Sequence, residues 1–156
     1  GIRSDVVEAA LAGAFDDPLV AREKVRALDA WRTSDDYRPL VTALKRAGNI
    51  VPKDFSGAVK KGVLKEDSEK ELFAAYSEIK DRVKEKTGKL DFRGALADIA
   101  SLRKPVDAFF DKVMVMDKDE AVKQNRLALL AGITGLFAGI ADFSRLELST
   151  DKTSTK

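Results

Sequence analysis

Two aspartates in the second half of the chain, Asp107 and Asp111, have the spacing of a shared site. They lie four residues apart in the stretch LRKPVDAFFDKVMVM, so both carboxylates project from one face of a helix. A pair of carboxylates on one face can bind a metal ion or serve as a general acid and base. The alternative is structural, with the same carboxylates holding a buried cation.

The rest of the composition does not support an independent enzyme. The chain contains no His and no Cys, which removes the commonest general base and the thiolate nucleophile. A hydrolase or metal enzyme built on Asp107 and Asp111 would therefore lack supporting groups. We expect no catalytic residue, no metal site and no cofactor within this chain.

Arg126 supplies the structural alternative for the two aspartates. The apolar residues expected to form the buried stripe of the last helix are Leu129, Leu130, Ile133, Leu136, Phe137 and Ile140. Extended towards the N-terminus, that stripe includes Arg126. A guanidinium directed at a core needs a carboxylate partner, because an unpaired buried charge is very costly. We predict that Arg126 pairs with Asp107 or Asp111 and thereby locks two helices together.

A second polar set lies on one face of the helix expected to end at Ile50. At about 100° per residue, Leu40, Leu44 and Ala47 face the core. The opposite side carries polar residues suited to RNA: Arg38, Thr42, Lys45 and Asn49, with Arg46 beside them. Cations bind phosphates, whereas amide and hydroxyl groups read base and ribose edges. An ordinary solvated helix face is the alternative interpretation.

The following irregular stretch, residues 52–66, adds further cations. Lys53, Lys60 and Lys61 lie within it, and we expect them to extend the same polar surface. Trp31 and Tyr37, close to the start of the helix, would either stack on an unpaired base or pack at the rim of the core. We favour packing at the rim of the core for both rings.

Three glycines interrupt the last helix, at Gly132, Gly135 and Gly139. They do not form a phosphate-binding loop, since no strand precedes them and no Lys-Ser or Lys-Thr pair follows. Each glycine costs a helix about 1 kcal/mol relative to alanine. We predict that they permit the close approach of a neighbouring helix.

The charge of the chain limits how it would bind nucleic acid. Its 28 basic and 26 acidic residues leave a net charge of +2, which is too balanced for binding through bulk charge. Any RNA site must be a local patch. No apolar run approaches the ~20 residues of a membrane span, and the lack of Cys favours a cytoplasmic protein with no membrane or DNA partner.

The residue pattern is helical almost throughout, with no alternating strand pattern. We predict helices over residues 5–15, 17–31, 34–50, 67–87, 90–101, a short segment after Pro105, and 119–143. This is an all-α bundle of about six to seven helices. We expect one domain over residues 1–147, a disordered polar tail over 148–156, and an origin within a longer chain, since the first residue is Gly1.

Two stretches carry a resemblance to a known family. They are DYRPLVTALKRAGNIV and SLRKPVDAFFDKVMVMDKDEAVKQNRLALLAGITGLFAGIADFSRL. Both resemble the C-terminal anticodon-binding domain of bacterial glycine–tRNA ligase beta subunits, a helical domain of the DALR type. PVDAFFDKVMVM followed by NRLALL is the more specific part, and KRAGNI is the second anchor. Gly48 departs from the pattern, where a better helix former is expected.

The resemblance implies that the domain binds the anticodon stem-loop of glycine tRNA. Its specificity for this tRNA would depend on the cytosines at the middle and end of the anticodon. It also implies a parent enzyme that uses ATP and Mg²⁺ to attach glycine to tRNA. In that enzyme a separate alpha subunit would carry most of the aminoacyl transfer. The helix-face argument assigns RNA binding to Arg38, Thr42, Lys45, Arg46, Asn49, Lys53, Lys60 and Lys61. The alternative function is a helical module that docks a partner subunit without contacting RNA.

Overall fold

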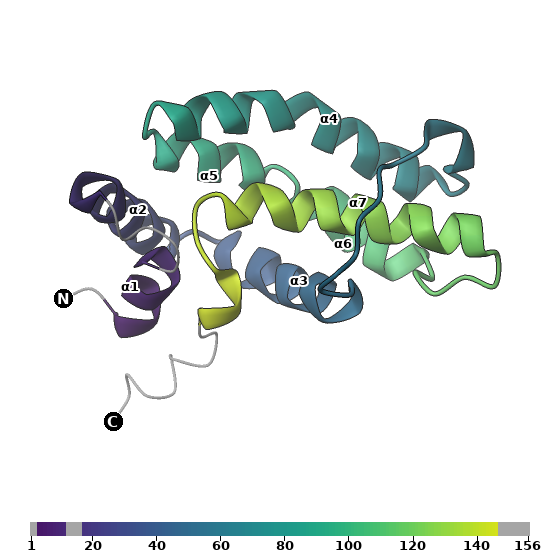
Figure 1. The fold of residues 1–156 in the computed structure, drawn as a ribbon, viewed down its shortest axis with the longest axis horizontal. Helices are drawn as coiled ribbons and strands as arrows, with labels where there is room; N and C mark the ends of the chain where they lie inside the picture. The colour runs from purple at the N-terminus through teal and green to yellow at the C-terminus, as the bar shows by residue number, and fades with distance from the viewer. Residues whose placement is uncertain (1–2, 12–16, 147–156) are drawn as a thin grey trace.

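The computed structural model describes residues 3–11 and 17–146, and every regular element in this part of the chain is helical (Figure 1). The elements are α1 (Ser4–Leu11), α2 (Pro18–Trp31), α3 (Tyr37–Ile50), the short 3₁₀ helix η1 (Lys61–Val63), α4 (Asp67–Gly88), α5 (Phe92–Ala100), α6 (Arg103–Lys112), α7 (Glu120–Ala138) and the 3₁₀ helix η2 (Phe143–Arg145). The predicted all-α class is confirmed.

In the described residues, aspartate side chains cap the N-termini of three α-helices. Asp17 accepts a hydrogen bond from the Leu19 N–H at 2.9 Å, and Pro18 follows at the first helical position. Asp91 caps α5 and Asp119 caps α7 in the same way, each with its carboxylate on a backbone N–H of the first turn. A capping carboxylate satisfies N–H groups that have no partner within the helix. These starts agree with the sequence-based boundaries to within two residues.

Some predicted boundaries were wrong. The last helix ends at Ala138 instead of continuing to residue 143, because the Ile140 and Ala141 N–H groups both donate to the Phe137 carbonyl and the chain turns back. The short helix begins at Arg103, before Pro105, since the first N–H groups of a helix need no intrahelical acceptor. Residues 12–15 of the first predicted helix and the predicted tail at 148–156 lie outside the described residues.

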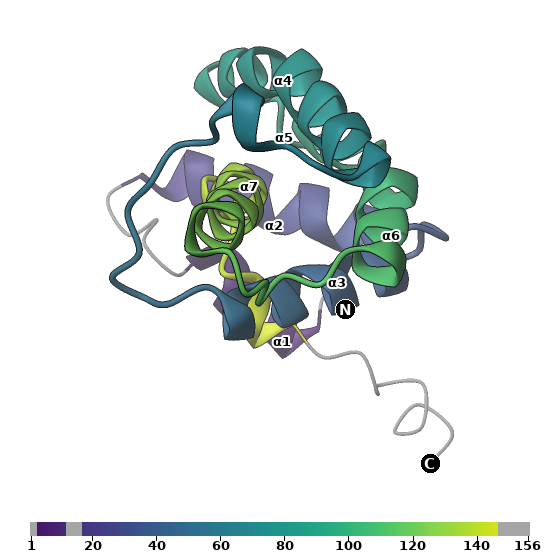
Figure 2. The ribbon, with the colours of Figure 1, turned by 90° about the vertical axis from the view of Figure 1, so that its right-hand side faces the viewer.

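Helix α7 is the centre of the molecule. Figures 1 and 2 show α4 and α5 covering it on one side, and α3 lying on the other with α6 beside it. Helix α7 is apolar around most of its circumference, as expected for a helix enclosed on several sides. Its consecutive residues from Leu127 to Leu130 are each at most 5% exposed. Helices α3 and α4 pack most extensively on α7, whereas α1, α2 and α6 are held mainly by other helices.

Arg126 is buried in α7, with only 3% of the residue exposed, and it is paired as a buried guanidinium requires. Its partners differ from those predicted. Nη2 contacts the Glu69 carboxylate at 2.8 Å, and Nη1 contacts Asp117 at 3.2 Å and the Met114 carbonyl at 2.5 Å. Burial opposes the charged form, yet the hydrogen bond and attraction of Glu69 leave the pKa of Arg126 raised.

The two predicted partners of Arg126 were therefore wrong. Asp107 lies 3.8 Å from Arg103 of its own helix, and Asp111 is exposed at the end of α6. The sequence pattern placed Arg126 correctly in the core but gave no information on which of the many carboxylates would reach it. Glu69 lies 57 residues away in the chain, and its approach depends on how α4 packs across α7.

Asn125, the residue before Arg126, fixes a different segment. It is 3% exposed, its Oδ1 accepts the Lys60 N–H at 2.6 Å, and its Nδ2 donates to the Lys60 carbonyl at 3.2 Å. The side chain thus pairs with both backbone groups of one residue in the 52–66 stretch. This stretch runs from α3 across α7 to α4, and Asn125 holds it against α7 (Figure 1).

The three glycines of the C-terminal segment have different surroundings. A Cβ on Gly132 would lie 2.9 Å from the Tyr76 ring and hydroxyl, so this glycine does permit the close approach of α4. The prediction was wrong for Gly135, where a Cβ would meet nothing within 4 Å. Gly139 caps the end of α7, and its nearest neighbour would be a backbone carbonyl of the same helix.

Arg126→Ala should lower the free energy of unfolding by about 3–5 kcal/mol, because it leaves the buried Glu69 carboxylate without its cation. Lys123→Ala is the matched control on α7, where a partly exposed lysine pairs with Glu120 across 3.7 Å. Its effect should stay below about 1 kcal/mol. Urea denaturation of both variants measures the difference, and equal losses would contradict the assigned role of Arg126.

Gly135→Ala should stabilise the protein by about 0.5–1 kcal/mol, since it improves helix propensity and meets no neighbour. Gly132→Ala has the same helical advantage but must displace the Tyr76 ring. We therefore expect a smaller gain or a net loss at Gly132. Thermal melting of the two variants in parallel checks this, and an equal gain at both sites would show that the Tyr76 contact imposes no constraint.

Candidate nucleic-acid interface

Helix α3 has two distinct faces. Its apolar side lies in the core, with Leu40, Val41, Leu44 and Ala47 each at most 2% exposed. Its outer side carries four exposed polar residues, Arg38, Thr42, Arg46 and Asn49, together with the half-buried Lys45. The helix ends at Ile50 because Pro52 restricts the preceding Val51 to an extended conformation. The outer face is thus a surface presented by a well-anchored helix.

One edge of this face is covered by the C-terminal segment. Lys45 Nζ donates to the Leu146 carbonyl, and a Cβ on Gly48 would lie 3.3 Å from the Phe143 ring. Gly48 therefore allows η2 to pack closely on α3, which gives a reason for the helix-weakening residue at this position. Lys45 contributes charge to the face, but its amine also holds the segment after η2.

The other edge of the face meets α6. The guanidinium carbon of Arg46 lies 4.4 Å from the centroid of the Phe110 ring, within cation–π range. A surface hollow of about 280 Å³ opens here between the two helices. Its lining consists of Pro39, Thr42, Ala43 and Arg46 from α3 and Asp107, Phe110 and Asp111 from α6. Figure 2 shows α3 and α6 as neighbours at this position.

The face is consequently less positive than the sequence of α3 alone indicates. Helix α3 contains no carboxylate, but α6 places Asp107 and Asp111 around the hollow that Arg46 enters. Asp36, just before α3, pairs with Arg103 at 3.2 Å. Sequence reasoning missed the combination of Arg46, Phe110 and these aspartates, since they come from segments about 60 residues apart.

The loop lysines do not all join this face. Lys53 is exposed shortly after the end of α3. The backbone of Lys60 is bound to Asn125 of α7, and Lys61 lines a different hollow with Lys70 and Phe73 of α4. Figure 2 shows the loop passing α7 on the side away from α6. Lys60 and Lys61 are thus separated from the hollow beside Arg46.

Trp31 and Tyr37 pack in the core, more deeply than the position at its rim that the sequence favoured. They are 7% and 3% exposed, and their rings meet edge to face with centroids 5.1 Å apart. Trp31 also packs 5.5 Å from Phe137 of α7. Burial raises the pKa of the Tyr37 hydroxyl, with a smaller contribution from Asp5. Both rings are thus packed against other aromatic side chains of the core.

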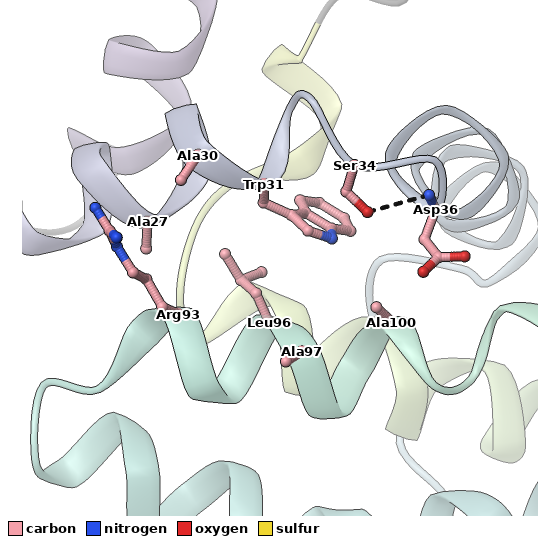
Figure 3. Close-up of a pocket in the computed structure, with 9 residues that line it drawn as sticks. All are labelled: Ala27, Ala30, Trp31, Ser34, Asp36, Arg93, Leu96, Ala97 and Ala100. Carbon is pink, nitrogen blue, oxygen red and sulfur yellow. Dashed lines mark hydrogen bonds between the residues drawn. The ribbon is translucent and has the colours of Figure 1, made fainter.

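Trp31 also forms one wall of a hollow of about 350 Å³ between α2 and α5 (Figure 3). Four alanines, from Ala27 to Ala100, and Leu96 form most of the lining, with Arg93 and Asp36 at its ends. Within residues 3–11 and 17–146, no group of three acidic, His or Cys side chains is arranged to hold a metal ion. No helix in the same residues is long and apolar enough to cross a membrane.

Comparison with known proteins identifies the fold as a member of an established family. The profile of the DALR anticodon binding domain matches residues 40–141, which include most of α3 and all of α4 to α7. The chain is 46% identical over 143 residues, 92% of its length, to the glycine–tRNA ligase beta subunit of Trichlorobacter lovleyi. It is 40% identical over 152 residues, 95% of its length, to that of Myxococcus xanthus.

The matched region covers only 21% and 22% of these two relatives, so the chain spans about a fifth of their length. The profile match includes the face from Thr42 to Asn49 and its α6 edge, whereas Arg38 and the covering residues Phe143 and Leu146 lie just outside it. The similarity to those relatives extends over more than 90% of this chain. The shared region therefore includes the α3 face and the buried residues Asn125 and Arg126. The chain belongs to the DALR anticodon-binding domain family.

Proposed function

We propose that this chain binds the anticodon stem-loop of glycine tRNA, with the outer face of α3 as the contact surface. The observation that carries the proposal is the exposure of Arg38, Thr42, Arg46 and Asn49 on one anchored helix of an anticodon-binding domain. Cations at this face would contact phosphates, and the amide and hydroxyl groups would contact unstacked bases or ribose. Lys45 and Lys53 would add charge at its margins.

The wider setting follows from the relatives. Their printed name is glycine–tRNA ligase beta subunit, so we propose that the chain serves a cytoplasmic enzyme attaching glycine to tRNA. ATP and Mg²⁺ would be used by that parent enzyme, with the alpha subunit as the protein partner. The domain would contribute binding and orientation of the tRNA, with no catalytic residue of its own.

Subunit docking without RNA contact is the second candidate. The observation in its favour is the exposure of Met114 and Met116, at 72% and 57%, in the loop between α6 and α7. Flexible, polarisable methionines are common at protein-binding surfaces. Docking through this loop would be largely insensitive to salt, whereas RNA binding through the α3 face would weaken as salt rises.

Titration of the chain with a glycine-tRNA anticodon stem-loop at several salt concentrations separates the two functions. RNA binding predicts that log K falls linearly with log salt, with a slope of roughly −0.7 to −0.9 per phosphate contact. Arg38→Gln should weaken binding by about three- to tenfold and make the slope shallower by about one contact. Fluorescence anisotropy of labelled RNA measures both quantities.

Arg93→Gln is the matched control, since it removes an exposed arginine from α5, which lies across α7 from α3 (Figure 1). This variant should leave both the affinity and the slope close to those of the unmodified chain. Absence of binding at low salt would contradict the proposed function, as would equal losses in the two variants.

A further inference from the structure

We infer that the groove between α2 and α5 is a contact surface for a second copy of this chain, which packs there in the reverse direction around a two-fold axis. The groove is the hollow of about 350 Å³ that Trp31 and four alanines line (Figure 3). Its two helices do not carry the proposed RNA contact, so the inference does not rest on the proposed function.

The two helices that form the groove run in the same direction. At one end, the Lys24 amine of α2 lies 5.6 Å from the centroid of the Phe92 ring, at the start of α5. At the other end, Asp36 after α2 pairs with Arg103 after α5 at 3.2 Å. The stretch between these contacts extends over about two helical turns, or roughly 10 Å. The groove therefore has a defined direction and two distinct ends.

Small and apolar side chains line the middle of the groove. Ala30 and Ala97 are exposed, one on each helix, and the buried Trp31 and Leu96 lie between them. The distance between packed helices depends on the side chains at the contact, so alanines allow other helices to approach closely. Covering this apolar surface removes it from water, which stabilises a complex.

The indole N–H of Trp31 also favours an occupied groove. Trp31 is 7% exposed, and its Nε1 is buried without a hydrogen-bond partner among the described residues. Figure 3 shows this nitrogen on the side of the ring that faces α5, between Leu96 and Ala100. A buried donor is stabilised when an acceptor reaches it. The indole therefore favours a partner that brings a hydroxyl or carbonyl oxygen to the groove.

The charges along the groove identify the partner as a second copy. Arg26 is exposed on α2 one turn before Ala30, and Arg93 is exposed at the same end on α5. The opposite end carries Asp35 and Asp36, and both helices end there, which adds the partial negative charge of their C-termini. Within residues 3–11 and 17–146, neither Arg26 nor Asp35 forms an ion pair. The groove thus has one positive and one negative end.

Two such grooves attract each other in only one of the two possible directions. If the helices of both copies ran the same way, like charges would meet, whereas reversal sets Arg26 of each copy against Asp35 of the other. The reversed arrangement is two-fold, so the same surface serves both copies and α5 lies against its own counterpart. Ala97, near the middle of the groove, then meets its counterpart as well. The net charge of +2 adds little repulsion between copies.

The complex should be weak, because about two helical turns bury less than the roughly 800 Å² per partner of a stable interface. We expect a dissociation constant on the order of 100 µM, and sedimentation velocity from about 10 µM to 1 mM should show a shift from monomer to dimer. The sample is the unmodified 156-residue chain. Its single tryptophan, Trp31, should change in emission over the same range. A chain that stays monomeric throughout this range overturns the inference.

An introduced thiol tests the contact at Ala97, since the chain contains no cysteine. Ala97→Cys should form a disulfide-linked dimer under mild oxidation, because the two-fold arrangement brings both copies of this position within disulfide reach. Ala74→Cys is the matched control, since it changes an exposed alanine that lies in a different hollow on α4. Equal yields of covalent dimer from the two variants would contradict the assigned surface.

An exchange of charge tests the direction of packing. Arg26→Glu alone and Asp35→Arg alone each set like charges together at both ends of the reversed pair, so each variant should associate about fivefold more weakly than the unmodified chain. An equimolar mixture of the two variants restores an attractive contact at both ends and should associate as strongly as the unmodified chain. Circular dichroism melts of each variant check that the fold is retained. A mixture that associates no better than either variant alone overturns the reversed arrangement.

Discussion

The buried pair of polar residues in α7, Asn125 and Arg126, is the constraint on which the rest of the structure depends. Between them they bind three other segments of the chain. Arg126 holds Glu69 at the start of α4, together with Met114 and Asp117 in the loop after α6. Asn125 holds the loop between α3 and α4 at Lys60. A buried polar group costs free energy when it lacks a partner, so each of these hydrogen bonds constrains the position of the segment that it binds.

This arrangement explains how the exposed polar face of α3 is obtained. Because α7 is enclosed, α3 can bury one side completely and present the other to solvent. The loop after α3 is drawn across α7 by Asn125, away from the hollow between α3 and α6. Asn125 thus leaves the hollow between α3 and α6 uncovered while it holds the loop against α7. Neither Asn125 nor Arg126 lines that hollow.

The face itself is a composite of three segments. Helix α3 supplies the cations, α6 supplies a phenylalanine and two aspartates, and the residues after α7 cover the far edge through Phe143 and Leu146. The charge and the aromatic content of the face therefore differ from those of α3 alone. Arg46 is a surface cation when α3 is considered alone, but in the folded domain it lies against an aromatic ring and shares a hollow with carboxylates.

Periodicity, capping residues and proline positions in the sequence were enough to predict the all-α class, most helix boundaries, the solvent side of α3 and the burial of Arg126. These depend on local geometry, since about 3.6 residues per turn sets which side chains share a face. The sequence did not determine the partners of Arg126, the separation of Lys60 and Lys61 from α3, or the meeting of Arg46 with Phe110. Only the tertiary structure decided these, because each joins segments far apart in the chain, and which surfaces meet is fixed by packing around α7.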